Sequence, residues 1–268
     1  MKTLSLHHPD VSLTVMGRRT AGFFLDCVAT YAEFLVSRGR CGLVRGCFPS
    51  DGAYRAAVQR LRSAGVVVYR KRHDGSRVIA LSGHGYAVPD ELNPERLWNK
   101  RWDGLWRVLV YDIEESERGF RNGLRNYLQR LRMGYLQQSV WVSPRDIRPA
   151  YADLQAALNV ESVSYLFECR TVLSRKSHDV VDEAWDVDRL KEDQEAYIHT
   201  WSDGVGKLRQ SLSTAEIGSL MREELLHFTE VMRRDPLLPR ELLPSGYRGM
   251  KAYGVHQAFV KALRRLVE

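Results

Sequence analysis

The stretch with the clearest capacity for chemistry is residues 106–115, "WRVLVYDIEE", where a predicted strand runs into Asp112. A strand-end carboxylate can hold a metal ion in a nuclease, but such a site needs several carboxylates that converge on the ion. Glu114, Glu115 and Glu117 stand at or before the next predicted helix, where the helix dipole favours acids without any metal. We therefore expect no catalytic residue and no metal, and keep a metal-dependent nuclease acting through Asp112 as the alternative.

A second set of residues has the side chains that read DNA. Residues 50–64 predict a helix whose N-cap is Ser50 or Asp51, with arginines and a glutamine on its polar face. Arginine pairs with guanine and glutamine with adenine in the major groove, while basic residues of a hairpin contact phosphates. The predicted DNA-binding residues are Ser50, Tyr54, Arg55, Gln59, Arg62, Arg70, Lys71, Arg72 and Arg77.

Aromatic and histidine residues are concentrated in the last third of the chain. There they form either the core of a helical bundle or a pocket for a small aromatic or acyl effector, whose anionic part would meet arginine. The residues predicted to bind the effector are Tyr197, His199, Trp201, His227, Arg234 and Arg248.

The elements around the DNA-reading residues predict an N-terminal winged helix-turn-helix over residues 1–85. Residues 20–38 have helical apolar spacing, and a turn at 49–51 precedes the second long helix. Residues 66–72 and 77–81 read as two strands joined at Asp74-Gly75, a strong hairpin signal. In this arrangement the later helix enters the major groove and the hairpin lies along the backbone.

Residues 86–101 are polar and read as a linker to a central domain over residues 102–176. In that domain strands alternate with helices, which predicts a ferredoxin-like α/β fold. The predicted strands are 105–113, 135–142 and 162–172, and the predicted helices are 117–133 and 148–158.

Residues 177–268 predict a helical domain, so the fold class is α+β with three domains. Ser213 and Glu216 have the spacing of a capping box, which begins a helix that Asp235-Pro236 ends. A last helix is predicted over residues 251–267.

Charge and composition limit the classes of function. The net charge is +7, and residues 1–101 hold 16 basic against 8 acidic residues, so the excess lies in the predicted DNA-binding part. No run of about 18 apolar residues is present, and we expect no membrane partner. The four cysteines are scattered without a C-x-x-C pair, which favours reduced thiols in the cytoplasm.

Several motifs resemble the PaaX family of bacterial transcriptional regulators. They are "YRAAVQRLRSAG", "WDGLWRVLVYDIEESERGFRNGLRNYLQRLRMGYLQQSVWVSP", "AWDVDRLKEDQEAYIHTW" and "DPLLPRELLPSGYRGMKAY". The second motif is also similar to the small ferredoxin-like CRISPR-adaptation nucleases, in which an Asp at the position of Asp112 has been proposed to bind metal. The last two motifs separate the chain from those nucleases, which lack such a C-terminal domain.

We interpret the central domain as a dimerisation unit that sets the spacing of two winged helices on a two-fold operator, so a homodimer is expected. The resemblance implies a repressor of catabolic genes such as those of phenylacetate catabolism. Such a protein binds double-stranded operator DNA and releases it when it binds an aryl-acyl-CoA such as phenylacetyl-CoA. No other cofactor is expected. A further alternative is a regulator of CRISPR or mobile-element genes that has no small-molecule effector.

Overall fold

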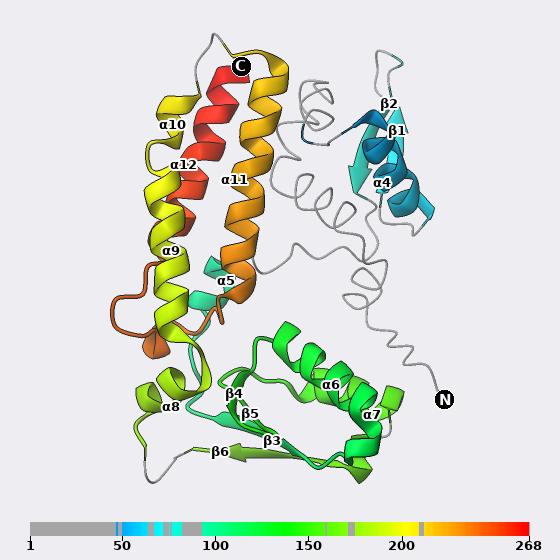
Figure 1. Ribbon diagram of the computed structural model, residues 1–268, viewed down its shortest axis with the longest axis vertical. Helices are drawn as coiled ribbons and strands as arrows, with labels where there is room; N and C mark the ends of the chain where they lie inside the picture. The colour runs from blue at the N-terminus through cyan, green and yellow to red at the C-terminus, as the bar shows by residue number, and fades with distance from the viewer. Residues whose placement is uncertain are drawn as a thin grey trace. The chain divides into compact units, whose positions relative to one another are not determined.

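The computed structural model divides the chain into two compact units (Figure 1). It describes residues 47, 50–63, 67–71, 75, 77–81, 93–158, 160–170, 175–208 and 212–267. Unit 1 comprises Pro94–Asp193 and Arg233–Gly249, and unit 2 takes in the other described residues. The predicted first helix of the winged domain, residues 20–38, lies outside the described residues, so that part of the fold prediction stays a prediction.

Unit 1 is built on a four-stranded antiparallel sheet with the order β4-β5-β3-β6. Helix α6 connects the first and second strands, and α7 the third and fourth. This β-α-β-β-α-β order is the split arrangement of ferredoxin-like domains. The bounds are β3 Trp106–Tyr111, 3-10 helix η2 Glu115–Glu117, α6 Arg118–Arg130, β4 Gly134–Gln137, β5 Val140–Ser143, α7 Arg148–Leu158, 3-10 helix η3 Val160–Ser162 and β6 Ser164–Cys169.

The predicted single strand over residues 135–142 is wrong, because these residues belong to a hairpin of β4 and β5. The turn at Gln138-Ser139 contains neither Gly nor Asn, so the sequence carries no hairpin signal there. Gln138 nevertheless adopts a positive φ of 23°, and a positive φ is typical of the two-residue turns that close hairpins. Because this segment forms two strands, the sheet has four strands where the sequence predicted three.

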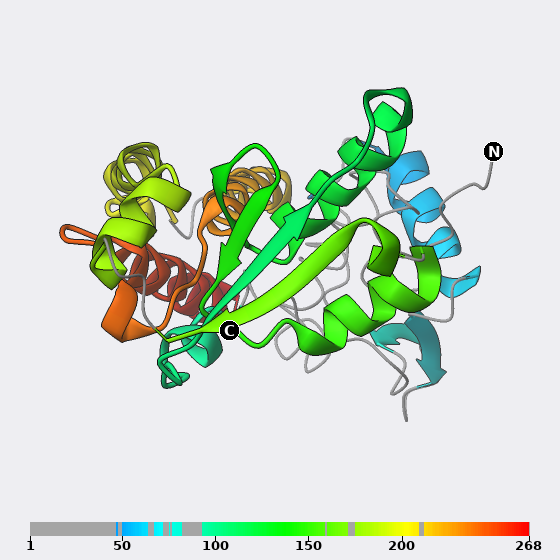
Figure 2. The ribbon, with the colours of Figure 1, turned by 90° about the horizontal axis from the view of Figure 1, so that it is seen from below.

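The two faces of the sheet are covered differently. Helices α6 and α7 lie on one face (Figure 2). Leu109 and Trp141 are paired in register and buried, and they point away from the face of their neighbours Val108 and Val142, which pack with α8. The opposite face meets helix α8, Ser177–Ala184, and the segment around the 3-10 helix η4, Arg240–Leu242. On that second face Tyr165 and Phe167 of the edge strand β6 remain 69% and 53% exposed. This leaves an aromatic surface open on the edge strand.

Glycine is required where α8 approaches the sheet. A Cβ atom on Gly134 would lie 2.6 Å from Ala184 Cβ and 2.8 Å from Trp185 Cε2, closer than side chains tolerate. The absence of a side chain at the start of β4 therefore lets α8 pack directly on the strand.

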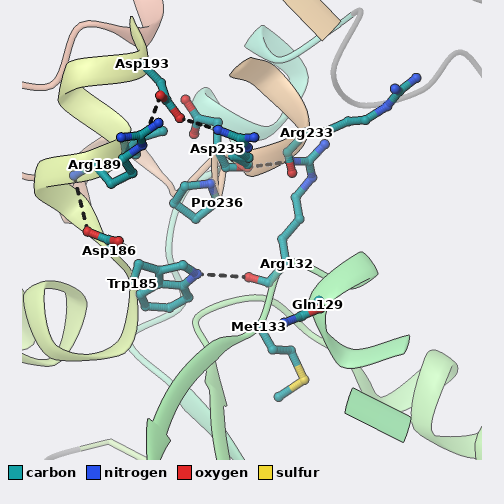
Figure 3. A pocket seen from close by; sticks show the side chains of 12 residues that line it. Gln129, Arg132, Met133, Trp185, Asp186, Arg189, Asp193, Arg233, Asp235 and Pro236 are labelled. Carbon is teal, nitrogen blue, oxygen red and sulfur yellow. Dashed lines mark hydrogen bonds and ion pairs between the residues drawn. The ribbon is translucent and has the colours of Figure 1, made fainter. Parts of the chain in front are cut away.

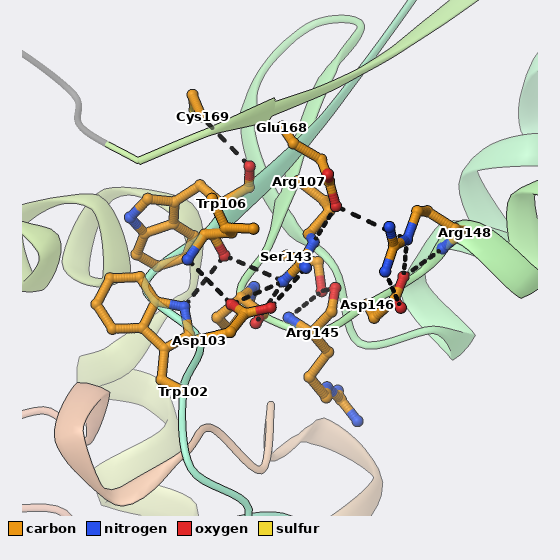
Figure 4. A network of polar contacts seen from close by, with 12 residues as sticks. Trp102, Asp103, Trp106, Arg107, Ser143, Arg145, Asp146, Arg148, Glu168 and Cys169 are labelled. Atoms are coloured by element: carbon orange, nitrogen blue, oxygen red, sulfur yellow. Dashed lines mark hydrogen bonds and ion pairs between the residues drawn. The ribbon is translucent and has the colours of Figure 1, made fainter.

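A buried arginine joins the start of the central domain to its sheet. Arg107 is 2% exposed, and its guanidinium bonds both carboxylate oxygens of Asp103 at 2.9 and 2.6 Å and Glu168 Oε1 at 2.9 Å (Figure 4). The planar guanidinium can serve two carboxylates at once, which makes a buried cation tolerable. The Arg107 bond lowers the pKa of Asp103.

The end of the predicted linker is folded. Helix α5, Glu95–Trp98, buries its last two residues, and the Trp98 ring meets Tyr247 edge-to-face at 6.1 Å. Both residues belong to unit 1, so the chain already packs against this unit before residue 102.

Unit 2 contains the main part of three long helices, which run side by side in Figure 1. Helix α11 begins with the predicted capping box, since Glu216 N–H donates to Ser213 Oγ at 3.3 Å and Ser213 N–H to Glu216 Oε2 at 2.8 Å. It ends before Asp235-Pro236, as predicted. The bounds are α9 Val187–Trp201, α10 Gly204–Lys207, α11 Thr214–Arg234 and α12 Gly249–Val267.

A helix and a hairpin complete the described part of unit 2. They are α4 Asp51–Ser63, β1 Val67–Lys71 and β2 Arg77–Leu81, and the two strands pair antiparallel. Among the described residues, no helix has both the length and the apolar character needed to span a membrane.

Candidate functional site

Helix α4 presents the polar face that the sequence predicts. Ser50 Oγ accepts the Ala53 N–H at 3.2 Å, so Ser50 is an N-cap that fixes the start of the helix. Ala57 and Val58 are buried. The side chains predicted to read bases lie on the solvent side: Arg55, Gln59 and Arg62 are exposed, and Tyr54 is half-buried.

The hairpin carries basic residues beside that helix. Arg70 and Lys71 are exposed at the end of β1. The Arg62 guanidinium lies 4.7 Å from the centre of the Tyr69 ring, a cation–π contact that joins α4 to β1. Arg77 begins β2, and Arg72 lies outside the described residues.

Asp112 is the first residue after β3, at the strand end as expected, and its side chain is exposed. Its backbone N–H donates to the Val163 carbonyl at 2.8 Å, which closes the end of the sheet. Glu115 pairs with Arg121 at 2.9 Å, and this bond lowers the pKa of Glu115. The described residues contain no group of three or more His, Cys, Asp or Glu that could hold a metal ion. The geometry around Asp112 therefore adds no support to the nuclease alternative.

Three of the residues predicted to bind an effector, Tyr197, Trp201 and His227, contact one another between helices α9 and α11. Trp201 Nε1 donates to His227 Nδ1 at 3.1 Å, and the Tyr197 ring meets His227 edge-to-face at 5.2 Å. Tyr197 and Trp201 are buried. His199, from the same helix, is exposed, whereas Arg234 and Arg248 belong to unit 1. The structure thus groups part of the predicted set and leaves the assignment of an effector site there a prediction.

At the centre of these helices lies a buried carboxylate that the sequence analysis missed. Glu224 is fully buried, and its Oε1 accepts the Tyr197 hydroxyl at 2.5 Å and lies 2.8 Å from His256 Nδ1. His256 stacks on Phe228 with ring centres 3.9 Å apart. A signal existed, because Glu224 stands between Met221 and Phe228 at the spacing of the apolar face of α11. We name Tyr197, Glu224 and His256 the bundle cluster.

Unit 1 contains a pocket of about 490 Å³ where three distant segments meet (Figure 3). Its walls combine arginines, aspartates and apolar side chains. The lining residues are Gln129, Arg132, Met133, Trp185, Asp186, Arg189, Leu190, Asp193, Arg233, Arg234, Asp235 and Pro236. Of the predicted effector residues, only Arg234 is among them. The sequence carries no local signal for this pocket, because its lining residues come from three segments far apart in the chain, residues 129–133, 185–193 and 233–236.

The pocket is held by hydrogen bonds between its segments. Arg132 has a positive φ of 59°, and its guanidinium donates to the Arg233 carbonyl at 3.2 Å and to the Asp235 carbonyl. Trp185 Nε1 donates to the Arg132 carbonyl at 3.3 Å. Asp235 accepts the Tyr247 hydroxyl at 2.7 Å, and burial together with this carboxylate raises the pKa of Tyr247 well above its usual value. Tyr247 therefore stays protonated and keeps Asp235 in place.

Comparison with known proteins identifies two consecutive domains of the chain. The family model of the PaaX protein central Cas2-like domain matches residues 99–181, and that of the PaaX-like protein C-terminal domain matches residues 185–268. No curated protein matches. A solved structure, titled uncharacterized protein Rv0674 from Mycobacterium tuberculosis, is similar in fold with a TM-score of 0.52 and 20% identity, over 88% of each chain.

The two matched domains follow one another in the order that the motifs predict and together span most of the chain. The chain therefore belongs to the PaaX family and has a Cas2-like central domain.

Proposed function

We propose that the protein is a transcriptional regulator that binds operator DNA through α4 and the β1–β2 hairpin. The observation that carries the proposal is the set of exposed Arg55, Gln59 and Arg62 on one helix beside exposed Arg70 and Lys71, in a chain whose PaaX domains belong to a family of regulators. The excess positive charge of residues 1–101 supports the same assignment.

In this proposal α4 enters the major groove. Arg55 and Arg62 each offer a planar guanidinium that pairs with the guanine edge, and Gln59 can bond adenine in two places. Arg70 and Lys71 contact phosphates, which gives affinity without sequence preference and a strong dependence on salt. The Arg62–Tyr69 contact would hold helix and hairpin in a constant relation.

We further propose that the central domain forms a homodimer. Tyr165 and Phe167 stack with ring centres 6.2 Å apart on the exposed face of edge strand β6, and a second copy would cover them. A two-fold dimer presents two recognition helices, so the operator would be a palindrome with half-sites separated by whole turns of DNA.

The regulatory scheme is that of a repressor. A small effector of the acyl-CoA type binds the regulator, favours the state with low affinity for DNA, and so releases the catabolic genes. The chain needs no catalytic residue for this role.

The decisive experiment measures binding of the full chain to a duplex selected from a random pool. Replacing Arg55 by Ala should weaken binding by about 1–3 kcal/mol and relax the preference at one base pair. Arg170→Ala removes another exposed arginine, outside α4 and the hairpin, and should leave affinity unchanged. If Arg55→Ala binds the selected duplex as tightly as the parent chain, the assignment of α4 as the reading helix is wrong.

A further inference from the structure

The segment that leads into helix α4 is bonded to helix α11 by one arginine. Arg222 of α11 donates from Nη1 to the Cys47 carbonyl at 3.2 Å, a contact between residues 175 positions apart in the chain. Both residues belong to unit 2, so the bond lies within one compact unit. We propose that Arg222 is a positioning residue, which anchors the start of α4 to α11 so that the polar face of α4 meets DNA in one orientation.

The Cys47 carbonyl lies close to the beginning of α4. Cys47 precedes the N-cap Ser50 by three positions, and an extended chain covers at most about 3.6 Å per residue, so the two residues lie within about 11 Å of each other. Cys47 is fully buried, so water does not compete freely for its carbonyl. A bond from Arg222 to this carbonyl therefore limits where the first turn of α4 can lie.

The part of α11 that carries Arg222 is itself held in place. Its neighbour Met221 is fully buried, and Glu224, two positions further, bonds Tyr197 of α9 and His256 of α12. These three helices run side by side (Figure 1). Because the bundle cluster fixes α11 among the helices at this level, Arg222 projects from a rigid base and can serve as an anchor.

The chemistry of the bond suits an anchor. A guanidinium is a charged donor that keeps its proton in proteins, and a charge-assisted bond to a carbonyl is stronger than a bond between neutral groups. The Arg222 side chain is half-buried, whereas the arginines of α4 that are proposed to read bases, Arg55 and Arg62, are exposed. Arg222 therefore acts on α4 through the backbone of the preceding segment.

One anchor can position both proposed DNA-binding elements. The Arg62 guanidinium lies 4.7 Å from the centre of the Tyr69 ring, so strand β1 of the hairpin is tied to α4. Base readout by Arg55 and Gln59 needs α4 at a fixed depth and angle in the major groove, because hydrogen bonds to base edges weaken steeply with displacement. An anchor at the start of α4 therefore contributes to affinity without touching DNA.

As a contribution to DNA binding, the role of Arg222 rests on the proposed function, whereas the anchoring of α4 does not. The anchoring is measured without DNA, by amide hydrogen exchange of the full chain read over α4. Arg222→Met keeps a long side chain without a donor and should speed this exchange about tenfold, because the segment before the helix loses a charge-assisted bond. Arg265→Met removes an exposed arginine from α12 of the same unit and should leave the exchange of α4 unchanged.

The effect on DNA binding is measured with the duplex that the full chain selects from a random pool. Arg222→Met should weaken binding about tenfold at every salt concentration, because no phosphate contact is removed. Loss of a phosphate contact would instead lower the slope of log affinity against log salt by about one. Arg222→Lys keeps a charged donor and should regain most of the affinity. Arg265→Met, which removes the same charge, should bind like the parent chain.

Several results would overturn the proposal. Unchanged exchange of α4 in Arg222→Met would show that the bond does not anchor the helix. Faster exchange in α9 and α12 as well would show that Arg222 supports the whole helical fold, since a lost anchor should affect α4 alone. A lower salt slope in Arg222→Met would make the residue a phosphate contact, and no recovery in Arg222→Lys would exclude the donor as the cause.

The two proposals fail separately. Faster exchange of α4 in Arg222→Met, in a chain that selects no duplex, would support the anchor and refute the proposed DNA-binding function. DNA binding that depends on Arg55 but not on Arg222 would support the regulator and refute the positioning role of Arg222.

Discussion

The bundle cluster and the polar residues of the unit 1 pocket differ in their access to water. This difference separates polar groups that only stabilise the fold from polar groups that can also bind a partner. The bundle cluster is closed: Tyr197 and Glu224 are fully buried and His256 is 4% exposed. In the pocket of unit 1, by contrast, the Arg189 and Arg234 side chains are 60% and 52% exposed beside an Asp193 that is 14% exposed. Closed polar groups must satisfy one another, whereas open ones can exchange partners with a ligand.

One atom of the bundle cluster lowers the stability of the fold. Among the described residues, Glu224 Oε2 is buried without a hydrogen-bond partner. Such an atom costs about 1–3 kcal/mol, so the remaining bonds of Glu224 matter more than ordinary ones. The cluster therefore makes the helix packing specific, since only one alignment of α9, α11 and α12 brings Tyr197 and His256 to the same oxygen.

The largest effect is expected where the closed cluster is opened. Replacing His256 by Ala removes both a partner of Glu224 and the stack on Phe228, and should lower the free energy of unfolding by about 3 kcal/mol, because a buried carboxylate loses a bond. Urea denaturation measures the loss. His199→Ala on the exposed side of α9 is the matched control and should stay within about 0.5 kcal/mol of the parent. Equal stability of the two variants would show that the cluster does not hold the helices.

A smaller loss of stability is expected when Trp185, which lines the pocket of unit 1, is displaced. Gly134→Ala places a Cβ within 2.8 Å of Trp185 and should cost about 1–3 kcal/mol through overpacking. Gly119→Ala is the control, since nothing lies within 4 Å of its Cβ in α6, and it should be neutral or stabilising. Thermal unfolding compares the two. If Gly134→Ala were as stable as Gly119→Ala, the packing of α8 on β4 would be looser than the structure shows.

The smallest effect is expected at an open ion pair in unit 1. A hydrogen bond from Arg148, 2.7 Å from the carboxylate, lowers the pKa of Asp146 from 3.8 to about 2. Because the folded pKa lies below the unfolded one, the stabilisation is fully present above about pH 4 and is lost as the pH falls toward 2. The effect is small, since the Arg148 side chain is 61% exposed and solvent screens the pair.

Asp146→Asn should remove this part of the acid dependence, which urea unfolding between about pH 5 and pH 2 would detect. An unchanged slope in that window would mean that the pair contributes nothing to stability.

The sequence predicted those parts of the fold that depend on local periodicity. Helices α6, α7, α11 and α12 lie within a few residues of their expected bounds, and the capping box at Ser213 and the stop at Asp235-Pro236 are confirmed. These features depend on neighbours three or four residues apart, which a single stretch of sequence contains. The family also followed from the sequence, because its motifs are local and ordered.

What the sequence by itself determined is therefore the order of most elements and the PaaX family, while the residues that read DNA stay a prediction. The tertiary structure decided the hairpin at Gln138, the burial of Glu224 and the pocket. The pocket joins Arg132, Asp193 and Arg234, residues from three segments that have no common pattern in the chain. Only tertiary packing brings charged residues from distant segments together. Their exposure to solvent then distinguishes a buried cluster that stabilises the fold from an open site that can bind a ligand.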